Sequence, residues 1–153
     1  MTELTEHPEY GVVAVLPVHF GDLDAMGQLH NARYINLVEQ AGEAVLARVG
    51  LGYRDGAITH PDMFAAIREL HISYQFPVRS TGPVAVHLWI ESLGTSSLRW
   101  GFRVHSVDGA VTHAEGHRTV VKVDPATGRS APWTDETRAA TTGLMREPAA
   151  STS

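Results

Sequence analysis

Two aspartates, Asp22 and Asp24, lie in the stretch FGDLDAMGQLHN, directly before a segment with helical periodicity. Backbone N–H groups in the first turn of a helix have no partner within the helix and carry the positive end of its dipole, so they polarise a carbonyl oxygen placed there. A carboxylate on the adjoining loop can then attack the carbonyl carbon or activate a water molecule. This pair of features suits acyl transfer.

A thioester suits these features better than an amide does. A thiol leaves near its pKa of about 8.5 and needs little help from a general acid, whereas an amine needs a proton donor. One carboxylate and one oxyanion site are therefore enough. The sequence has no G-x-S-x-G, no phosphate-binding G-x-x-x-x-G-K and no dinucleotide-binding G-x-G-x-x-G, so other hydrolase and nucleotide-binding classes lack their usual motifs.

Composition narrows the class of protein further. With 43% hydrophobic and 19% charged residues, the 153-residue chain is typical of one globular domain, predicted over residues 1–153. The net charge of -5 and a single lysine, Lys122, argue against a nucleic-acid surface or a polybasic membrane patch. Cysteine is absent, which excludes disulfides and thiolate nucleophiles. Neither a signal peptide nor a membrane span is evident, so we expect a cytoplasmic protein.

Histidines in HAEGH, His113 and His117, have the spacing that chelates a metal ion on a helix. The flanking valines favour a strand instead, and a rise of about 3.3 Å per residue separates the two imidazoles by roughly 13 Å. One ion cannot bind both at that separation. We therefore predict no metal site and place these histidines on a sheet surface or at an oligomer contact.

A strand before the loop and a long helix after it must position the two aspartates. Tyr10–Phe20 is β-branched and apolar, and its proline argues against a helix. From Asn31 onward, apolar residues recur at three- and four-residue spacing, with Asn31 as the predicted N-cap and Gly50 as the residue after the C-cap. Glu39 is the conspicuous polar residue on the apolar face of this helix.

The rest of the chain predicts an antiparallel sheet. Four strand-like runs follow the helix, at residues 63–76, 84–93, 97–107 and 110–123. Arg99 and Arg103 alternate with apolar residues, which predicts one buried and one exposed face. Short turns between consecutive strands give antiparallel pairing, so the order of elements predicts an α+β fold in which five strands cover one helix.

The C-terminal region is predicted to end in a short helix and a tail. The helix begins at about Thr134, which is a good N-cap residue. Residues 148–153, PAASTS, form the end of the chain and are predicted to be disordered.

The segment FGDLDAMGQLHNARY resembles the signature of the 4-hydroxybenzoyl-CoA thioesterase family of hot-dog-fold proteins, F-G-D-x-D-x-x-G-H-V-N-N-x-x-Y, which precedes a helix with a glutamate where Glu39 lies. ISYQFPVRSTG is similar to the family's Y-x-x-P segment, and VVKVDPATGRSAPW to its closing strand and turn. The resemblance extends from about Val12 to Trp133. It implies a five-stranded sheet around one helix, subunits paired edge to edge as a dimer or tetramer, and an acyl-CoA site at the subunit interface.

The resemblance also implies site residues. The family's catalytic carboxylate is the second aspartate of D-x-D, which is Asp24, and the thioester carbonyl is bound by backbone amides in the region of Asn31. The substrate-binding positions that follow from the motif are Gly27, His30, Tyr34 and Glu39. Gln28 and His30 replace the family's histidine and first asparagine, so these two positions bear on the substrate class.

The candidate residues also have structural interpretations. Asp24 is alternatively a cap of the following turn, and Asp22 is expected to fasten the bend through backbone N–H groups. His30 is either a second base or pocket wall, or a ring that packs on the helix. Glu39 is expected to have a hydrogen-bond partner, because buried carboxylates usually do. Tyr34 belongs either to the substrate site or to the core or a dimer contact.

The predicted function is hydrolysis of an acyl-CoA to the free acid and CoA, with CoA as part of the substrate and no separate cofactor. Two enzymatic alternatives stay open: an acyl-carrier-protein thioesterase, and a hot-dog hydratase or dehydratase that uses Asp24 with His30. Outside the enzymes, the alternative is a non-catalytic acyl-thioester-binding protein. Such a protein would retain its ligand without releasing free thiol.

Overall fold

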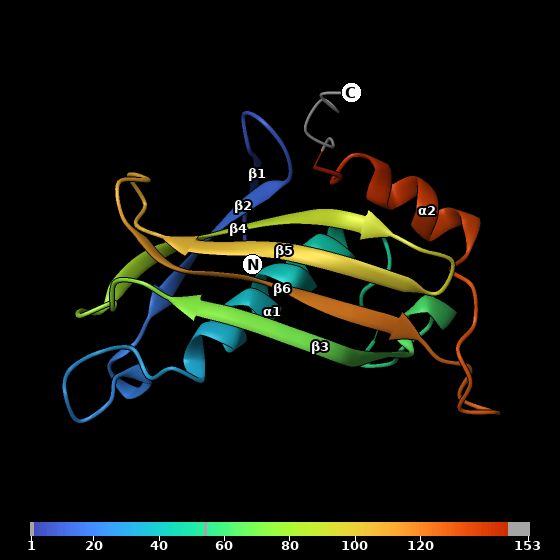
Figure 1. Cartoon of the computed structure of the whole chain (residues 1–153), viewed down its shortest axis with the longest axis horizontal. Helices are drawn as coiled ribbons and strands as arrows, with labels where there is room; N and C mark the ends of the chain where they lie inside the picture. The colour runs from blue at the N-terminus through green and yellow to red at the C-terminus, as the bar shows by residue number, and fades with distance from the viewer. Residues whose placement is uncertain (1, 54, 147–153) are drawn as a thin grey trace, which may run out of the picture.

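A six-stranded antiparallel sheet forms the body of the molecule, and the long helix α1 lies behind it (Figure 1). The computed structural model describes residues 2–53 and 55–146. The strands are β1 (Leu4–Glu6), β2 (Val12–Val18), β3 (Ala65–Tyr74), β4 (Gly82–Leu93), β5 (Ser97–His105) and β6 (Thr112–Lys122). The helices are α1 (Arg33–Arg48), α2 (Asp135–Thr142) and the short 3-10 turns η1 (Phe20–Asp22) and η2 (Pro61–Met63).

The predicted α+β hot-dog architecture is confirmed, with one correction to the number of strands. The order in the sheet is β1-β2-β4-β5-β6-β3, six strands rather than five. The added strand, β1, is only three residues long and pairs with β2 from Leu4 opposite Ala14 to Glu6 opposite Val12. A run this short shows no alternation from which it could be predicted. The predicted disordered tail at 148–153 lies outside the described residues.

Helix α1 ends where the sequence predicts but begins later. The C-cap is Val49, and Gly50 follows it with φ of +81°, donating its N–H to the carbonyl of Ala47 at 3.2 Å. At the other end the N-cap is Ala32, and no side chain caps it. The prediction of Asn31 as the N-cap is therefore wrong, because its side chain makes no capping hydrogen bond.

Strand β3 forms a free edge of the sheet. It pairs only with β6 among the described strands, whereas α1 packs chiefly on β2, β4 and β5. All ten β3 residues except Ile72 are exposed, among them Ile67 at 52% and Leu70 at 43%. An exposed, long, apolar edge strand is a site where another chain can pair.

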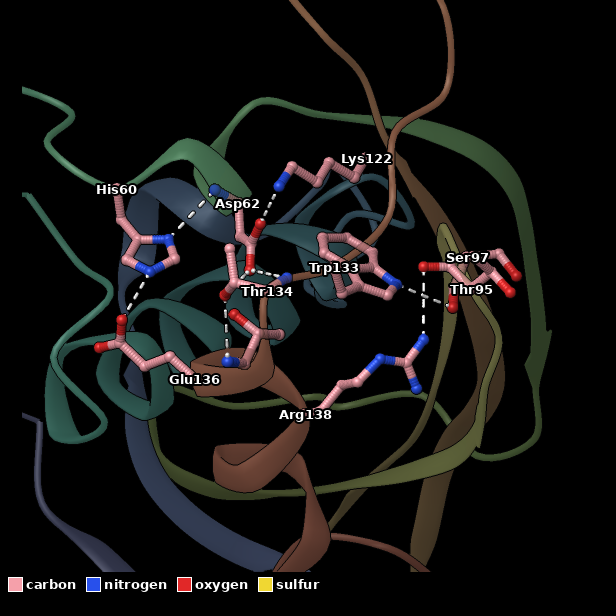
Figure 2. A network of polar contacts seen from close by, with 10 residues as sticks. His60, Asp62, Thr95, Ser97, Lys122, Trp133, Thr134, Glu136 and Arg138 are labelled. Atoms are coloured by element: carbon pink, nitrogen blue, oxygen red, sulfur yellow. Dashed lines mark hydrogen bonds and ion pairs between the residues drawn. The ribbon is translucent and has the colours of Figure 1, made fainter.

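Helix α2 closes one end of the molecule. Thr134 caps it, because its hydroxyl accepts a hydrogen bond from the N–H of Thr137 at 3.3 Å, which confirms the predicted C-terminal helix. Arg138 donates to the carbonyl of Gly94 at 2.8 Å. It also donates to the carbonyl of Thr95 at 3.4 Å (Figure 2), so α2 is attached to the turn between β4 and β5. In the part of the chain that the structure describes, no helix has the length and apolar character that crossing a membrane requires.

Candidate active site

The loop between β2 and α1 is closed by Asp24. One carboxylate oxygen, Oδ1, accepts hydrogen bonds from the N–H groups of Met26 at 2.8 Å and Gln28 at 3.1 Å. Gly27, at φ of +74°, lets the backbone complete the turn and donates to the Asp24 carbonyl at 3.0 Å. Oδ2 has no hydrogen-bond partner among the described residues. The turn-capping role of Asp24 is therefore real, and it leaves one oxygen available for chemistry.

Asp22 fastens the other side of the same loop, as predicted. Its Oδ2 accepts from the N–H of His19 at 2.8 Å, and its backbone carbonyl accepts from the N–H of His30 at 2.9 Å. Its Oδ1 lies 3.9 Å from Nε of Arg33 in the first turn of α1. These contacts hold the loop against the start of the helix.

His30 makes hydrogen bonds to the two residues at the start of α1. Its Nδ1 accepts from the N–H of Ala32 at 3.1 Å, and its carbonyl accepts from the N–H of Arg33 at 2.8 Å. The next two N–H groups, of Tyr34 and Ile35, have no partner among the described residues. Two backbone donors at the positive end of the helix dipole therefore stay available for a carbonyl oxygen.

Tyr34 lies in the core. Its side chain is 3% exposed, and its hydroxyl accepts from the N–H of Val78 at 3.3 Å. Its ring meets Tyr74 edge-on at 5.2 Å, and burial raises the pKa of the Tyr34 phenol. The Tyr74 hydroxyl donates to the carbonyl of Asn31 at 2.9 Å, so the end of β3 is attached to the start of α1.

A cavity of about 260 Å³ lies at the other end of α1, between that helix, the strands β5 and β6, and α2. Of the six predicted site residues, only Glu39 lines it; Asp24, Gly27, His30, Asn31 and Tyr34 do not. The helix rises about 14 Å from Arg33, its first residue, to Gly42, which also lines the cavity. Within one copy of the chain, the loop and the cavity are therefore separate.

Glu39 has the partner that was expected, but it is not buried. Its Oε1 lies 3.4 Å from Nη1 of Arg118, and its side chain is 51% exposed while that of Arg118 is 15% exposed. Burial lowers the pKa of the Arg118 guanidinium, and Glu39 opposes that shift. No role was assigned to Arg118 from the sequence. The sequence signal that could have indicated it is its position two residues before Val120, which places both side chains on the inward-facing side of β6.

Asp62, which lines the cavity, forms a buried ion pair with Lys122 (Figure 2). The Asp62 carboxylate also accepts from the hydroxyl of Thr134 at 2.7 Å and from its N–H at 3.1 Å. His60 accepts from the N–H of Asp62 at 3.1 Å, and its Nε2 lies 3.0 Å from Oε2 of Glu136. These contacts join η2 and β6 to the start of α2, so that α2 covers the cavity.

The sequence model of the Thioesterase-like superfamily matches residues 18–141, a range that includes the loop, α1, the strands β3 to β6 and most of α2. The chain therefore belongs to this superfamily and is a thioesterase-family enzyme with the hot-dog fold.

Individual relatives agree with this assignment. The chain is 23% identical over 97 residues to YneP of Bacillus subtilis (strain 168), a candidate acyl-CoA thioesterase by its name, and the match covers 63% of this chain and 69% of YneP. The PA2801 protein of Pseudomonas aeruginosa, a candidate thioesterase, is 30% identical, with a TM-score of 0.74 over 90% of this chain and 98% of that protein.

A thioesterase of Thermus thermophilus, solved with coenzyme A and Zn, has the same fold. Its TM-score to this chain is 0.73 at 24% identity, and the match covers 94% of this chain and 100% of that one.

Proposed function

We propose that this protein hydrolyses acyl-CoA thioesters with Asp24 as the general base or nucleophile. The observation that carries the proposal is that Asp24 has an unpartnered carboxylate oxygen directly before a helix start with two unpartnered N–H groups, among the residues that the structure describes. Water, or Asp24 itself by way of a mixed anhydride, adds to the thioester carbonyl while the N–H groups near Asn31 stabilise the oxyanion. The carbon–sulfur bond then breaks, and CoA leaves as a thiolate that takes up the proton removed from water. If Asp24 attacks directly, water afterwards hydrolyses the anhydride, which frees the acid and restores the carboxylate.

Two similar proteins and the loop motif support CoA as the thiol part of the substrate. YneP is named for acyl-CoA, and the Thermus thermophilus thioesterase was solved with coenzyme A. The loop of this chain also resembles the signature of the 4-hydroxybenzoyl-CoA thioesterases. We extend the acyl-CoA substrate class to this chain on that basis, with an acyl-carrier-protein thioester as the alternative.

We further propose that the chain acts as an edge-to-edge homodimer through β3. At one end of β3, Tyr74 is bonded to Asn31 beside the loop; at the other end, Ala65 lines the cavity. Two copies of β3 related by a two-fold axis pair antiparallel, so the Tyr74 end of one copy lies beside the Ala65 end of its partner. The loop of each copy then lies next to the cavity of the other.

In this dimer, the two parts of the proposed site, which are separate within one copy, lie next to each other. The thioester carbonyl binds at the start of α1 in one subunit, and the acyl group extends into the cavity of the partner subunit. Figure 1 shows that the loop before α1 and helix α2 lie at opposite ends of one copy. A two-fold axis through β3 would therefore place the loop end of one copy beside the α2 end of its partner.

The test is thiol release from a panel of acyl-CoAs by the Asp24→Asn variant. Asparagine keeps the oxygen that accepts from Met26 and Gln28, so the loop persists while the charge is lost. We expect turnover to fall by roughly 10²–10⁴-fold, the usual contribution of a general base. Full turnover of every accepted acyl-CoA by this variant would contradict the proposal.

Asp124→Asn is the matched control. Asp124 closes its own turn in the same way, with Oδ1 accepting from the N–H of Ala126 at 2.8 Å, and it lies in the loop after β6. This variant should keep wild-type turnover. Hydration of an enoyl thioester without thiol release would instead favour the hydratase alternative, and tight binding without either reaction would favour a non-catalytic binder.

A further inference from the structure

Arg118 is a charged residue in an apolar position. On the inner face of the sheet it lies opposite Trp100 of β5 and Leu70 of β3. Its side chain is 15% exposed and lines the cavity with apolar groups from α1, β5 and α2. An isolated guanidinium in such surroundings loses hydration and needs hydrogen-bond acceptors to replace it.

The chain itself supplies few acceptors. Nη1 has one contact, with Glu39 at 3.4 Å, and Nε is buried without a partner among the described residues. Nη2 has no hydrogen bond in the same part of the chain. It lies 3.8 Å from the point that a Cβ on Gly42 would occupy. A guanidinium has five N–H donors, so most of its donors are unused. An unused donor in a cavity is a position where a ligand acceptor gains affinity.

Charge around the cavity decides which acceptor fits. The cavity is lined by three carboxylates: Glu39, Glu43 and Asp62. Lys122 neutralises Asp62, and Arg118 faces Glu39, so no cation remains over for an anionic ligand among the described residues that line the cavity. A ligand carboxylate would add repulsion, whereas a hydroxyl or keto oxygen adds an acceptor without charge.

We propose that Arg118 determines specificity for acyl groups that carry a neutral oxygen, a hydroxyl or keto group, on the part of the chain that enters the cavity. Nη2 of Arg118 donates a hydrogen bond to that oxygen, and the apolar walls hold the rest of the acyl chain. This inference rests on the proposed function, because it takes the cavity as the acyl site.

The test uses S-alkyl-CoA thioethers, which have no thioester carbonyl and therefore cannot be cleaved by a thioesterase. Calorimetry compares each unsubstituted alkyl thioether with its ω-hydroxyalkyl counterpart, in even chain lengths from butyl to dodecyl. At the length that reaches Arg118, we expect the hydroxylated probe to bind about tenfold more tightly to the wild type, the usual effect of a hydrogen bond to a charged group. Arg118→Met should remove this preference without weakening the unsubstituted probe.

Arg103→Met is the matched control, because the Nε of Arg103 is also buried without a partner among the described residues but Arg103 does not line the cavity. It should keep the preference. Arg118→Lys, which retains a cation and one donor group, should keep part of it and guards against a folding defect in the methionine variant. Circular dichroism checks that all three variants are folded.

Equal binding of both probes by the wild type at every length, or an unchanged preference in Arg118→Met, would overturn the inference. Because both probes would still bind in those cases, the proposed acyl-CoA function would stand. Binding of neither probe would overturn the inference and the acyl-CoA substrate class together.

Discussion

Asp24 uses one carboxylate oxygen to hold its loop and leaves the other one without a partner among the described residues. Capping a turn and acting on a substrate are therefore compatible roles for this residue. The hydrogen bonds from Met26 and Gln28 also restrict its rotamer, which aims the second oxygen before any substrate binds. His30 contacts the same helix start, where its Nδ1 accepts from the N–H of Ala32.

The buried Asp62–Lys122 pair predicts a specific acid sensitivity. Burial alone raises the pKa of Asp62, but the Lys122 ammonium and the hydroxyls of Thr137 and Thr134 outweigh it and lower the pKa from 3.8 to about 2. A carboxyl group whose pKa is lower in the folded state stabilises the fold at pH values above its unfolded-state pKa. This stabilisation is lost as the pH falls through the folded-state pKa. We expect a loss of about 2 kcal/mol between about pH 4 and pH 2.

Urea unfolding at a series of pH values measures this loss. Asp62→Asn should be less stable than the wild type near neutral pH, and the difference should shrink as the pH falls toward 2. Asp108→Asn is the control, because Asp108 also has a lowered pKa but lies on an exposed turn. Parallel curves for the wild type and Asp62→Asn would show that the ion pair does not contribute in this way.

At the scale of elements, α1 and β3 decide where the two parts of the proposed site lie. The loop lies at the start of α1 and next to the end of β3, while the cavity lies near the end of α1 and next to the start of β3. The loop and the cavity thus lie at opposite ends of β3 within one copy. Because β3 is the free edge, pairing of β3 with a second copy can bring the loop of one copy next to the cavity of the other.

Local patterns predicted the long elements, and non-local contacts account for what was missed. Alternation around Arg99 and Arg103 predicted β5, and the Gly50 signal predicted the end of α1. The Asp62–Lys122 pair joins residues far apart in the sequence, so no local pattern could show it. The N-cap is Ala32 instead of the predicted Asn31, and the hydrogen bond from the N–H of Ala32 to the His30 ring depends on a ring geometry that residue type alone does not specify.

Gly116→Ala tests how β3 is attached. A Cβ at Gly116 would lie 1.9 Å from the backbone carbonyl oxygen of His71, so β3 would have to shift away from β6. We expect destabilisation of about 1–3 kcal/mol, typical of overpacking, and weaker dimerisation.

Gly143→Ala is the control, because a Cβ there meets no atom within 4 Å in the described part of the chain. Urea unfolding and analytical ultracentrifugation would detect both effects, and wild-type behaviour of Gly116→Ala would show that the two strands do not approach so closely.

For the whole molecule, we propose that the chemistry and the acyl binding of the enzyme come from different copies. The chain belongs to the thioesterase-like superfamily, and one copy has the candidate carboxylate and the cavity at opposite ends of its central helix. Pairing through β3 would place Asp24 of one subunit beside the cavity of its partner. The exposed apolar residues of β3 and the separation of Asp24 from the cavity have the same explanation in this dimer.

Complementation between two inactive variants tests this claim most directly. Asp24→Asn removes the carboxylate, and Gly42→Leu fills the cavity beside Arg118. Both homodimers should be inactive on acyl-CoA. A mixed dimer has one site with both changes and one site with neither, so a mixture with random assortment should recover about one quarter of the wild-type rate of thiol release. No recovery, with subunit exchange confirmed by native mass spectrometry, would contradict the shared site.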